Sequence, residues 1–143
     1  MPVPVPASLL RRLGAMFYDS MLLVAVFLIG TALFLPFTHG EAIGGALLRG
    51  LHRLTLLALT TGFYGLFWTR SGQTLGMAAW RLRIEREDGG RLTWRDTVVR
   101  LAAATLSLLA LGIGFLWILF DPDDLAWHDR LSRTRVVLVP KRK

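Results

Sequence analysis

Three long apolar runs dominate the hydrophobic pattern of this chain. They extend from Leu13 to Phe37, from Ala46 to Trp68 and from Thr97 to Phe120. At a rise of about 1.5 Å per residue, a helix over such a run approaches the ~30 Å thickness of the hydrocarbon core of a bilayer. Too little polar sequence remains among 143 residues to cover three such helices in water. The pattern therefore predicts a small, mainly α, helical transmembrane protein.

Helix boundaries follow from the residues that flank these runs. We predict helices over residues 9–36, 46–69 and 97–120. The first run is longer than the apolar part of a signal peptide and contains Asp19, which argues against cleavage. The second carries Arg49, His52 and Arg53 in its first turns, so it spans a bilayer only if the arginine side chains extend to the headgroups.

Between the second and third runs the apolar residues follow a period of two. Trp80, Leu82 and Ile84 alternate with charged residues, a turn signal follows at residues 88–90, and the alternation resumes at Leu92 and Trp94. This pattern predicts a β-hairpin over residues 80–94 with one apolar face. A further strand is expected over residues 135–139. Residues 1–8 are rich in proline and are expected to form an extended, poorly ordered tail, so that residues 9–143 make up one membrane domain.

Composition narrows the classes of protein that fit. Apolar residue types make up 53% of the chain and charged types 19%, and both values lean toward a membrane protein. There is no cysteine, which excludes disulfides and thiolate metal sites. The net charge of +7 suits nucleic acid, anionic lipid or the cytoplasmic loops of a membrane protein, and the apolar runs favour the third of these. Because tryptophans and apolar runs accompany the basic residues, we expect anionic lipid headgroups and no nucleic acid.

The distribution of basic residues bears on topology. If all three runs cross the membrane, nine Lys and Arg residues lie on one side and eight on the other, which gives no bias. If the third run kinks near Gly112–Gly114 and returns to the face it entered, the split becomes fifteen to two. The charge rule favours this re-entrant arrangement, whereas a length of about 24 residues equally allows one straight crossing. Both arrangements of the third run stay open. The predicted protein therefore has two full spans, a third helix that is either long or re-entrant, and a cytoplasmic hairpin.

Asp19 is the residue that most needs an explanation, because a carboxylate inside a membrane costs roughly 2.5–3.5 kcal/mol unless it has a partner. Arg12 lies two turns earlier on the same face, but helical side chains lean toward the N-terminus, so a direct pair within the helix is not expected. We predict that Asp19 pairs with Arg100 and that Arg12 pairs with a lipid phosphate or with Asp129. Such a cluster either binds an ion or a proton, or fixes the helices without a ligand.

Catalytic and metal-binding patterns are weak. Ser71–Met77 contains two glycines but no P-loop lysine, so it suits a turn better than a phosphate site. His128 and Asp129 are adjacent, which is not a metal-ligand spacing, and no serine lies in a nucleophile context. We therefore expect no enzyme, no cofactor and no metal.

Four segments in order resemble the RDD family of bacterial membrane proteins. They are Arg12–Asp19, the Gly-Gln-Thr-x-Gly loop at Gly72–Met77, Arg100, and Trp127–Leu131 followed by Thr134–Val137. The resemblance implies that Arg12, Asp19 and Asp129 are the residues that give the family its name, and it adds Gln73, His128 and Arg130 as secondary site candidates. Asp121–Asp124 departs from the pattern, since many relatives are basic there.

The resemblance implies an inner-membrane location but little biochemistry, because most relatives are of unknown function. We expect a multi-pass protein of the bacterial inner membrane, with a cytoplasmic N-terminus. Our leading hypothesis is an accessory, assembly or binding module that uses its basic face on lipids or protein partners, as a homo-oligomer or with other proteins. The alternative is an oligomeric monovalent cation/proton antiporter, proposed for some relatives. A lowered pKa of an aspartate beside an arginine counts against that alternative.

Overall fold

The structure is a computed structural model that describes residues 5–39 and 42–140. Its elements, in chain order, are α1 (Leu9–Ala32), α2 (Leu35–Thr38), α3 (Ala46–Ser71), α4 (Leu75–Ala79), β1 (Leu82–Arg86), α5 (Trp94–Leu109), α6 (Ile113–Leu116), the 3-10 helix η1 (Trp117–Leu119), α7 (Trp127–Ser132) and β2 (Thr134–Leu138). The mainly helical class predicted from the sequence is confirmed. Glu41 and the basic residues at 141–143 lie outside the described residues.

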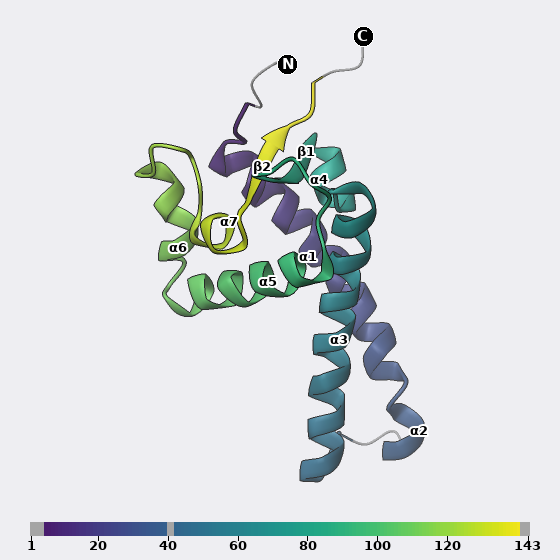
Figure 1. The fold of residues 1–143 in the computed structure, drawn as a ribbon. Coiled ribbons are helices and arrows are strands. Elements are labelled where there is room, and N and C mark those ends of the chain that lie inside the picture. Colours follow the sequence, from purple (N-terminus) through teal and green to yellow (C-terminus); the bar gives the residue numbers. More distant parts are fainter. Residues whose placement is uncertain (1–4, 40–41, 141–143) are drawn as a thin grey trace.

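Helices α1 and α3 form a long pair with the short α2 at one end, and the remaining elements gather toward the other end (Figure 1). Gly30 permits the close approach, since a Cβ atom there would lie 2.4 Å from Leu59 Cδ1. A hydrogen bond of 3.0 Å between Thr31 Oγ1 and His52 Nε2 joins the two helices at the other end. The first helix ends at Ala32, four residues earlier than predicted, and Pro36 lies in the first turn of the short α2, where proline is tolerated.

The third apolar run is bent rather than straight. α5 ends at Leu109, and the chain turns by 108° before α6 and η1 continue. Leu111 and Gly112 both have positive φ, at 55° and 78°, which ends the α-helical ladder at this point. The predicted kink near Gly112 is therefore present, and a single helix over 97–120 is not. α5 also starts three residues earlier than predicted, because Thr93 and Asp96 form a capping box.

The predicted hairpin over residues 80–94 is wrong. β1 pairs antiparallel with β2, far away in sequence, with Ile84 opposite Val136. The turn residues 88–90 lead into α5, because the capping box at Thr93 begins a helix where a second strand was expected. The C-terminal strand is confirmed within one residue of its predicted ends.

Residues 5–7 lie along β2 rather than forming a loose tail. The backbone N–H of Ala7 donates to Val136 O at 3.1 Å, and that of Leu138 donates to Val5 O at 2.9 Å. Residues 1–4 of the predicted tail lie outside the described residues.

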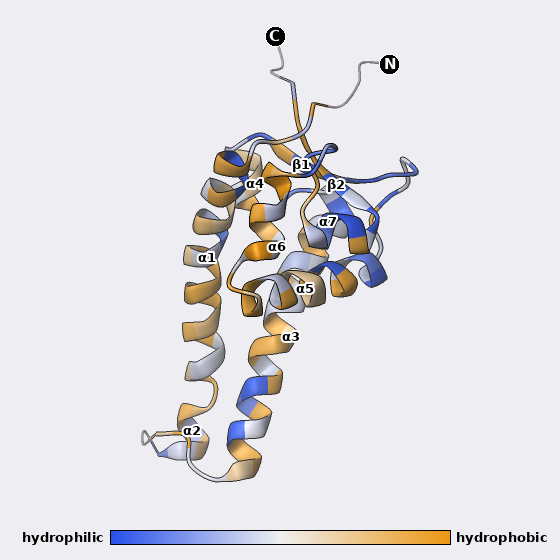
Figure 2. Cartoon of the chain, turned by 90° about the vertical axis from the view of Figure 1, so that its left-hand side faces the viewer, coloured by the Kyte–Doolittle hydropathy of each residue, from blue (hydrophilic) through white to orange (hydrophobic). Residues whose placement is uncertain are grey.

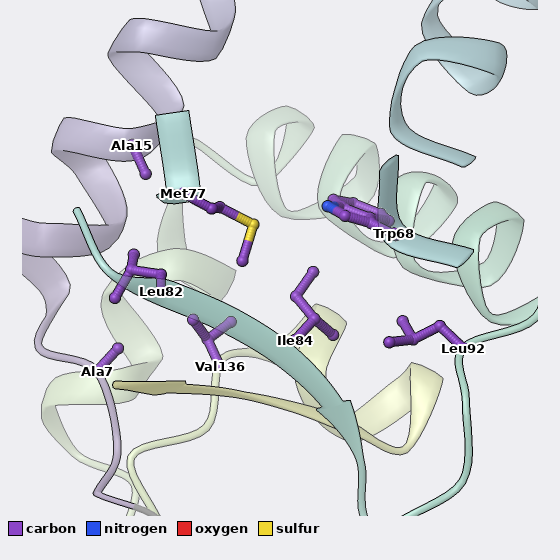
Figure 3. Packing of buried hydrophobic residues seen from close by; sticks show 8 residues of the cluster. All are labelled: Ala7, Ala15, Trp68, Met77, Leu82, Ile84, Leu92 and Val136. Carbon is purple, nitrogen blue, oxygen red and sulfur yellow. The ribbon is translucent and has the colours of Figure 1, made fainter. Parts of the chain in front are cut away.

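A small apolar core lies where the sheet meets the helices (Figure 3). Its members share low exposure and come from the N-terminal segment, α1, α3, α4, both strands and the loop before α5: Ala7, Ala15, Trp68, Met77, Leu82, Ile84, Leu92 and Val136. Large apolar side chains on α1 are exposed outside this core, among them Phe17, Val24 and Leu28. Figure 2 shows apolar residues along most of α1, whereas hydrophilic ones gather around α7 and in the first half of α3.

Within the described residues, α1 is long and apolar enough to cross a membrane, and α5 with α6–η1 meets the same criterion if the bent pair counts as one span. α3 does not meet it, and its first turns carry Arg49, His52 and Arg53. The structure thus has one or two candidate spans, and the predicted number of spans stays a prediction.

The contact between α3 and α5 gives a first test. A Cβ atom added at Gly65 would lie 2.0 Å from Cζ3 of Trp94, at the start of α5, whereas one at Gly62 would meet nothing within 4 Å. We expect Gly65→Ala to lower the free energy of unfolding by about 1–3 kcal/mol. The control Gly62→Ala should raise it by about 0.5–1 kcal/mol, because alanine favours the helix. Denaturant titration in mixed micelles measures both, and equal effects would contradict the packing described.

Candidate functional site

The candidate site is built around the carboxylate of Asp129, which is fully buried in the first turn of α7. Arg12 of α1 donates from Nη1 to Asp129 Oδ2, and Arg100 of α5 places Nη1 2.6 Å from Asp129 Oδ1. Both guanidiniums are also buried. These three residues, here called the Arg–Asp–Arg cluster, join α1, α5 and α7 through one carboxylate. The predicted contact between Arg12 and Asp129 is present.

Backbone and hydroxyl groups complete the cluster. Arg12 donates from Nε to Ala7 O at 3.0 Å and from Nη2 to Asp124 O at 3.1 Å. Arg100 Nη1 donates to Thr134 Oγ1 at 2.7 Å, and that hydroxyl lies 2.7 Å from Ser132 Oγ. The guanidinium of Arg12 is therefore occupied on all three nitrogens, and it also holds the N-terminal segment in place.

The electrostatics of α7 follow from this geometry. Burial alone would raise the pKa of Asp129, but the positive charges of Arg100 and Arg12 outweigh it and lower this pKa to about 2. Burial lowers the pKa of His128 to about 3, and the charge of Arg100 adds to this effect. At neutral pH the carboxylate is thus ionised and the imidazole neutral.

Asp19 does not pair with Arg100, so the predicted ion pair is wrong. Its Oδ2 accepts a hydrogen bond from the hydroxyl of Thr74, and its Oδ1 accepts one from the backbone N–H of Gly76 at 2.9 Å. These donors come from the start of α4, which packs against α1. The buried carboxylate is thus satisfied by neutral donors.

The glycine-containing loop makes this contact possible. A Cβ atom at Gly76 would lie 2.4 Å from the carbonyl oxygen of Ala15 and 2.8 Å from Asp19 Oδ1, so only glycine fits. Thr74 also caps α4 by accepting from the N–H of Met77. Gln73 donates from Nε2 to Leu82 O at 2.6 Å, which joins the loop to β1. The hydroxyl of Thr74 and the side-chain amide N–H of Gln73 therefore both have structural partners.

The other secondary candidates differ in their placement. His128 is buried beside the cluster, with its Nε2 3.7 Å from Asp129 Oδ1 and its ring centroid 4.7 Å from that of Phe115. Arg130 is exposed and pairs with Asp121, with its Nε 2.9 Å from Asp121 Oδ1, outside the cluster. The acidic turn at 121–124 therefore binds a basic residue of this chain.

Sequence reasoning missed three side chains that the site uses, namely Thr74, Ser132 and Thr134. Thr74 carried a signal, because a threonine one residue before a short helix is a common cap. Thr134 carried only its place in the Thr134–Val137 segment of the resemblance, and Ser132 carried no signal, since the role of both depends on how α7 meets α5. Among the described residues, no three His, Asp or Glu side chains come together in a way that could hold a metal ion.

A pocket of about 330 Å³ lies beside the cluster, between α1, α3 and α5. Its wall is mainly apolar, with Arg12, Asp19, Arg100 and His128 among its polar members. Arg100 also lies over the indole of Trp68, with its guanidinium carbon 5.5 Å from the ring centroid, a favourable cation–π geometry. We call this cavity the arginine pocket.

The neutral, buried His128 predicts a pH dependence. Its pKa falls from 6.5 in the unfolded chain to about 3 in the folded protein, so only the unfolded chain takes up a proton as the pH drops below 6.5. This contribution to stability is complete above pH 6.5 and declines by about 1.4 kcal/mol per pH unit below it. We expect His128→Gln to flatten the decline in unfolding free energy between pH 6.5 and 5. A slope unchanged by His128→Gln would contradict the burial described.

Comparison with known proteins agrees with this architecture. The profile of the RDD family matches residues 6–133, a range that includes Arg12, Asp19, Arg100 and Asp129. No curated protein and no solved structure matches the chain. Because the family match covers most of the sequence, the chain belongs to the RDD family.

Proposed function

We propose that this chain is a multi-pass accessory module of the bacterial inner membrane that binds anionic lipid headgroups at one end. That end, formed by α4, α7, β1 and β2, is here called the sheet end. Family membership, the candidate span α1 and the exposed apolar side chains support the membrane placement. The proposal assigns the module no catalytic step.

The distribution of arginines carries the proposal. Exposed arginines near the sheet end include residues of β1, the loop after it, the start of α5 and the end of α7, namely Arg83, Arg91, Arg95, Arg130 and Arg133. Arg130 pairs with Asp121, and no ion pair among the described residues involves the other four. Unpaired, exposed guanidiniums suit lipid phosphates, each contributing about 1 kcal/mol near an anionic surface.

The preference of Lys and Arg residues for the cytoplasmic side of a membrane supports a cytoplasmic sheet end. The bend of 108° between α5 and α6 is what a re-entrant third segment requires. In that arrangement the N-terminus, the loop between β1 and α5, and the C-terminal residues share one side. Fifteen of the seventeen Lys and Arg residues, the buried Arg12 and Arg100 included, then belong to segments on the cytoplasmic side, while Arg49 and Arg53 belong to the other side.

The Arg–Asp–Arg cluster serves as a support for the sheet end. Asp129 stays ionised near neutral pH because the charges of two arginines lower its pKa to about 2, so it does not carry protons there. The oxygens of Asp19 accept hydrogen bonds from Thr74 and Gly76. Neither carboxylate is therefore poised as a cation ligand, which argues for binding rather than ion exchange.

A pair of matched variants tests the lipid proposal. We expect phosphatidylglycerol in nanodiscs to raise the unfolding midpoint of the wild-type protein relative to neutral phosphatidylcholine alone. Arg83→Gln/Arg91→Gln should remove about 2 kcal/mol of this lipid-dependent stabilisation, since each arginine near the surface contributes about 1 kcal/mol.

The control Arg49→Gln/Arg53→Gln removes the same charge from the first turns of α3 and should retain the effect. Equal losses in both double variants, or no effect of phosphatidylglycerol on the wild type, would contradict the proposal. A protein partner at this surface would show as binding that is lost in the first double variant without any response to phosphatidylglycerol, which would also overturn it.

A further inference from the structure

The arginine pocket has the size and lining of a ligand site. Its volume of about 330 Å³ lies at the lower end of the range for small-molecule sites, which are typically apolar with a few placed polar groups. Its apolar wall comes from several helices and includes Met16, Leu23, Leu101, Leu108 and Ile118. No residue of this wall is needed to explain the Arg–Asp–Arg cluster, so the pocket calls for its own account.

Two buried polar atoms on the pocket wall have no hydrogen-bond partner among the described residues. Trp68 Nε1 and His128 Nδ1 are both buried without a hydrogen bond, and both residues are more than nine-tenths buried. In Figure 3 the indole nitrogen of Trp68 lies on the edge of the ring that faces Met77, another residue of the pocket wall. Leaving such a buried donor unpaired costs free energy, which a ligand with an acceptor would recover.

Arg100 supplies further donors to the same wall. Its Nη1 serves Thr134 and Asp129, while Nε and Nη2 have no acceptor among the described residues. Its guanidinium lies over the indole of Trp68. A guanidinium with a free edge binds carboxylate or phosphate oxygens well, because its N–H groups match their geometry.

The charge balance of the cluster favours an anion. Two guanidiniums surround the single carboxylate of Asp129, and the imidazole of His128 is neutral, which leaves one buried positive charge in excess. Asp19 also lines the pocket, and its carboxylate offsets part of this charge at a distance, but its oxygens accept hydrogen bonds from Thr74 and Gly76 and form no ion pair among the described residues. An anionic group beside Arg100 would meet the excess charge of the Arg–Asp–Arg cluster directly.

We propose that the arginine pocket binds a single-chain anionic amphiphile, with a carboxylate or phosphate headgroup at Arg100 and Trp68 and its alkyl chain along the apolar wall. The apolar wall disfavours a small hydrophilic anion, and the excess positive charge disfavours a neutral lipid. This inference rests on the proposed membrane placement, which would supply such molecules. It concerns an internal pocket and not the exposed arginines of the sheet end.

Tryptophan fluorescence of the full chain in a neutral maltoside detergent provides the test, with 9,10-dibromostearate as the probe. Bromine quenches indole at short range, so we expect dibromostearate to quench at a concentration at least tenfold lower than 9,10-dibromostearyl alcohol, which has the same chain but no charge. Trp68→Phe removes the indole that lines the pocket and leaves the other four tryptophans, so it should remove most of the saturable quenching if the bromine lies beside Trp68.

A blocking variant and its control separate the pocket from the rest of the surface. Ala104 lines the pocket, whereas Ala102 on the same helix is exposed and does not. We expect Ala104→Phe to weaken dibromostearate binding at least tenfold and Ala102→Phe to leave it within twofold. These variants leave all three residues of the Arg–Asp–Arg cluster in place, so the test does not depend on Arg100→Gln, which would strand Asp129.

Competition between the probe and unbrominated amphiphiles identifies which headgroup the arginine pocket accepts. Displacement of the probe by stearate alone indicates a free fatty acid, and displacement by lysophosphatidic acid as well indicates that a phosphate headgroup is accepted; both results support the proposal. Equal quenching by the acid and the alcohol, displacement by inorganic phosphate or acetate without a chain, or an unaffected Ala104→Phe would overturn it. Arg83→Gln/Arg91→Gln should bind the probe normally, so failure here is distinct from failure at the sheet end.

Discussion

A carboxylate removed from water must meet positive charge or hydrogen-bond donors, and in this protein that requirement assembles three helices. Asp129 lies on α7, near the end of the chain, yet its two oxygens contact Arg12 of α1 and Arg100 of α5. Removing one partner of such a pair typically costs about 3–5 kcal/mol, because the other charge stays buried. The N-terminal segment depends on the same cluster, since Arg12 also donates to Ala7 O beside β2. The sheet end and the arginine pocket both depend on this one contact.

Much of the helical architecture could be predicted from the sequence, because the lengths of the apolar runs indicate the helices and the positions of the glycines indicate where a helix bends. The three runs gave the helices, and Gly112 marked the bend of the third. The direction in which helical side chains lean excluded a pair between Arg12 and Asp19, and Asp129 was one of the two partners predicted for Arg12 instead. The hydrogen-bond partners of Asp19 could not be predicted by pairing it with an oppositely charged residue at a similar depth in the membrane. Its partners are a hydroxyl and a backbone N–H, and the latter depends on how closely Gly76 lets α4 approach α1.

Strand pairing shows a second limit. The alternation of apolar and charged residues around Leu82 and Ile84 correctly indicated a strand. The same alternation is compatible with a partner strand that lies either near or far along the chain. Thr93 and Asp96 favour a helix start immediately after the turn, and this local signal decides against a hairpin. The partner strand is therefore β2, which α7 brings into place through the buried Asp129. The long-range contact thus decides what the local pattern leaves open.

A double-mutant cycle between Arg12 and Asp129 tests the central claim most directly. The free energy of unfolding would be measured in mixed micelles for the wild type, Arg12→Gln, Asp129→Asn and the double variant. The account predicts that each single variant is destabilised and that the double variant loses less than the sum of the two losses, by at least about 1 kcal/mol. Additive losses within about 0.5 kcal/mol would show that the two residues do not interact, and would contradict the account.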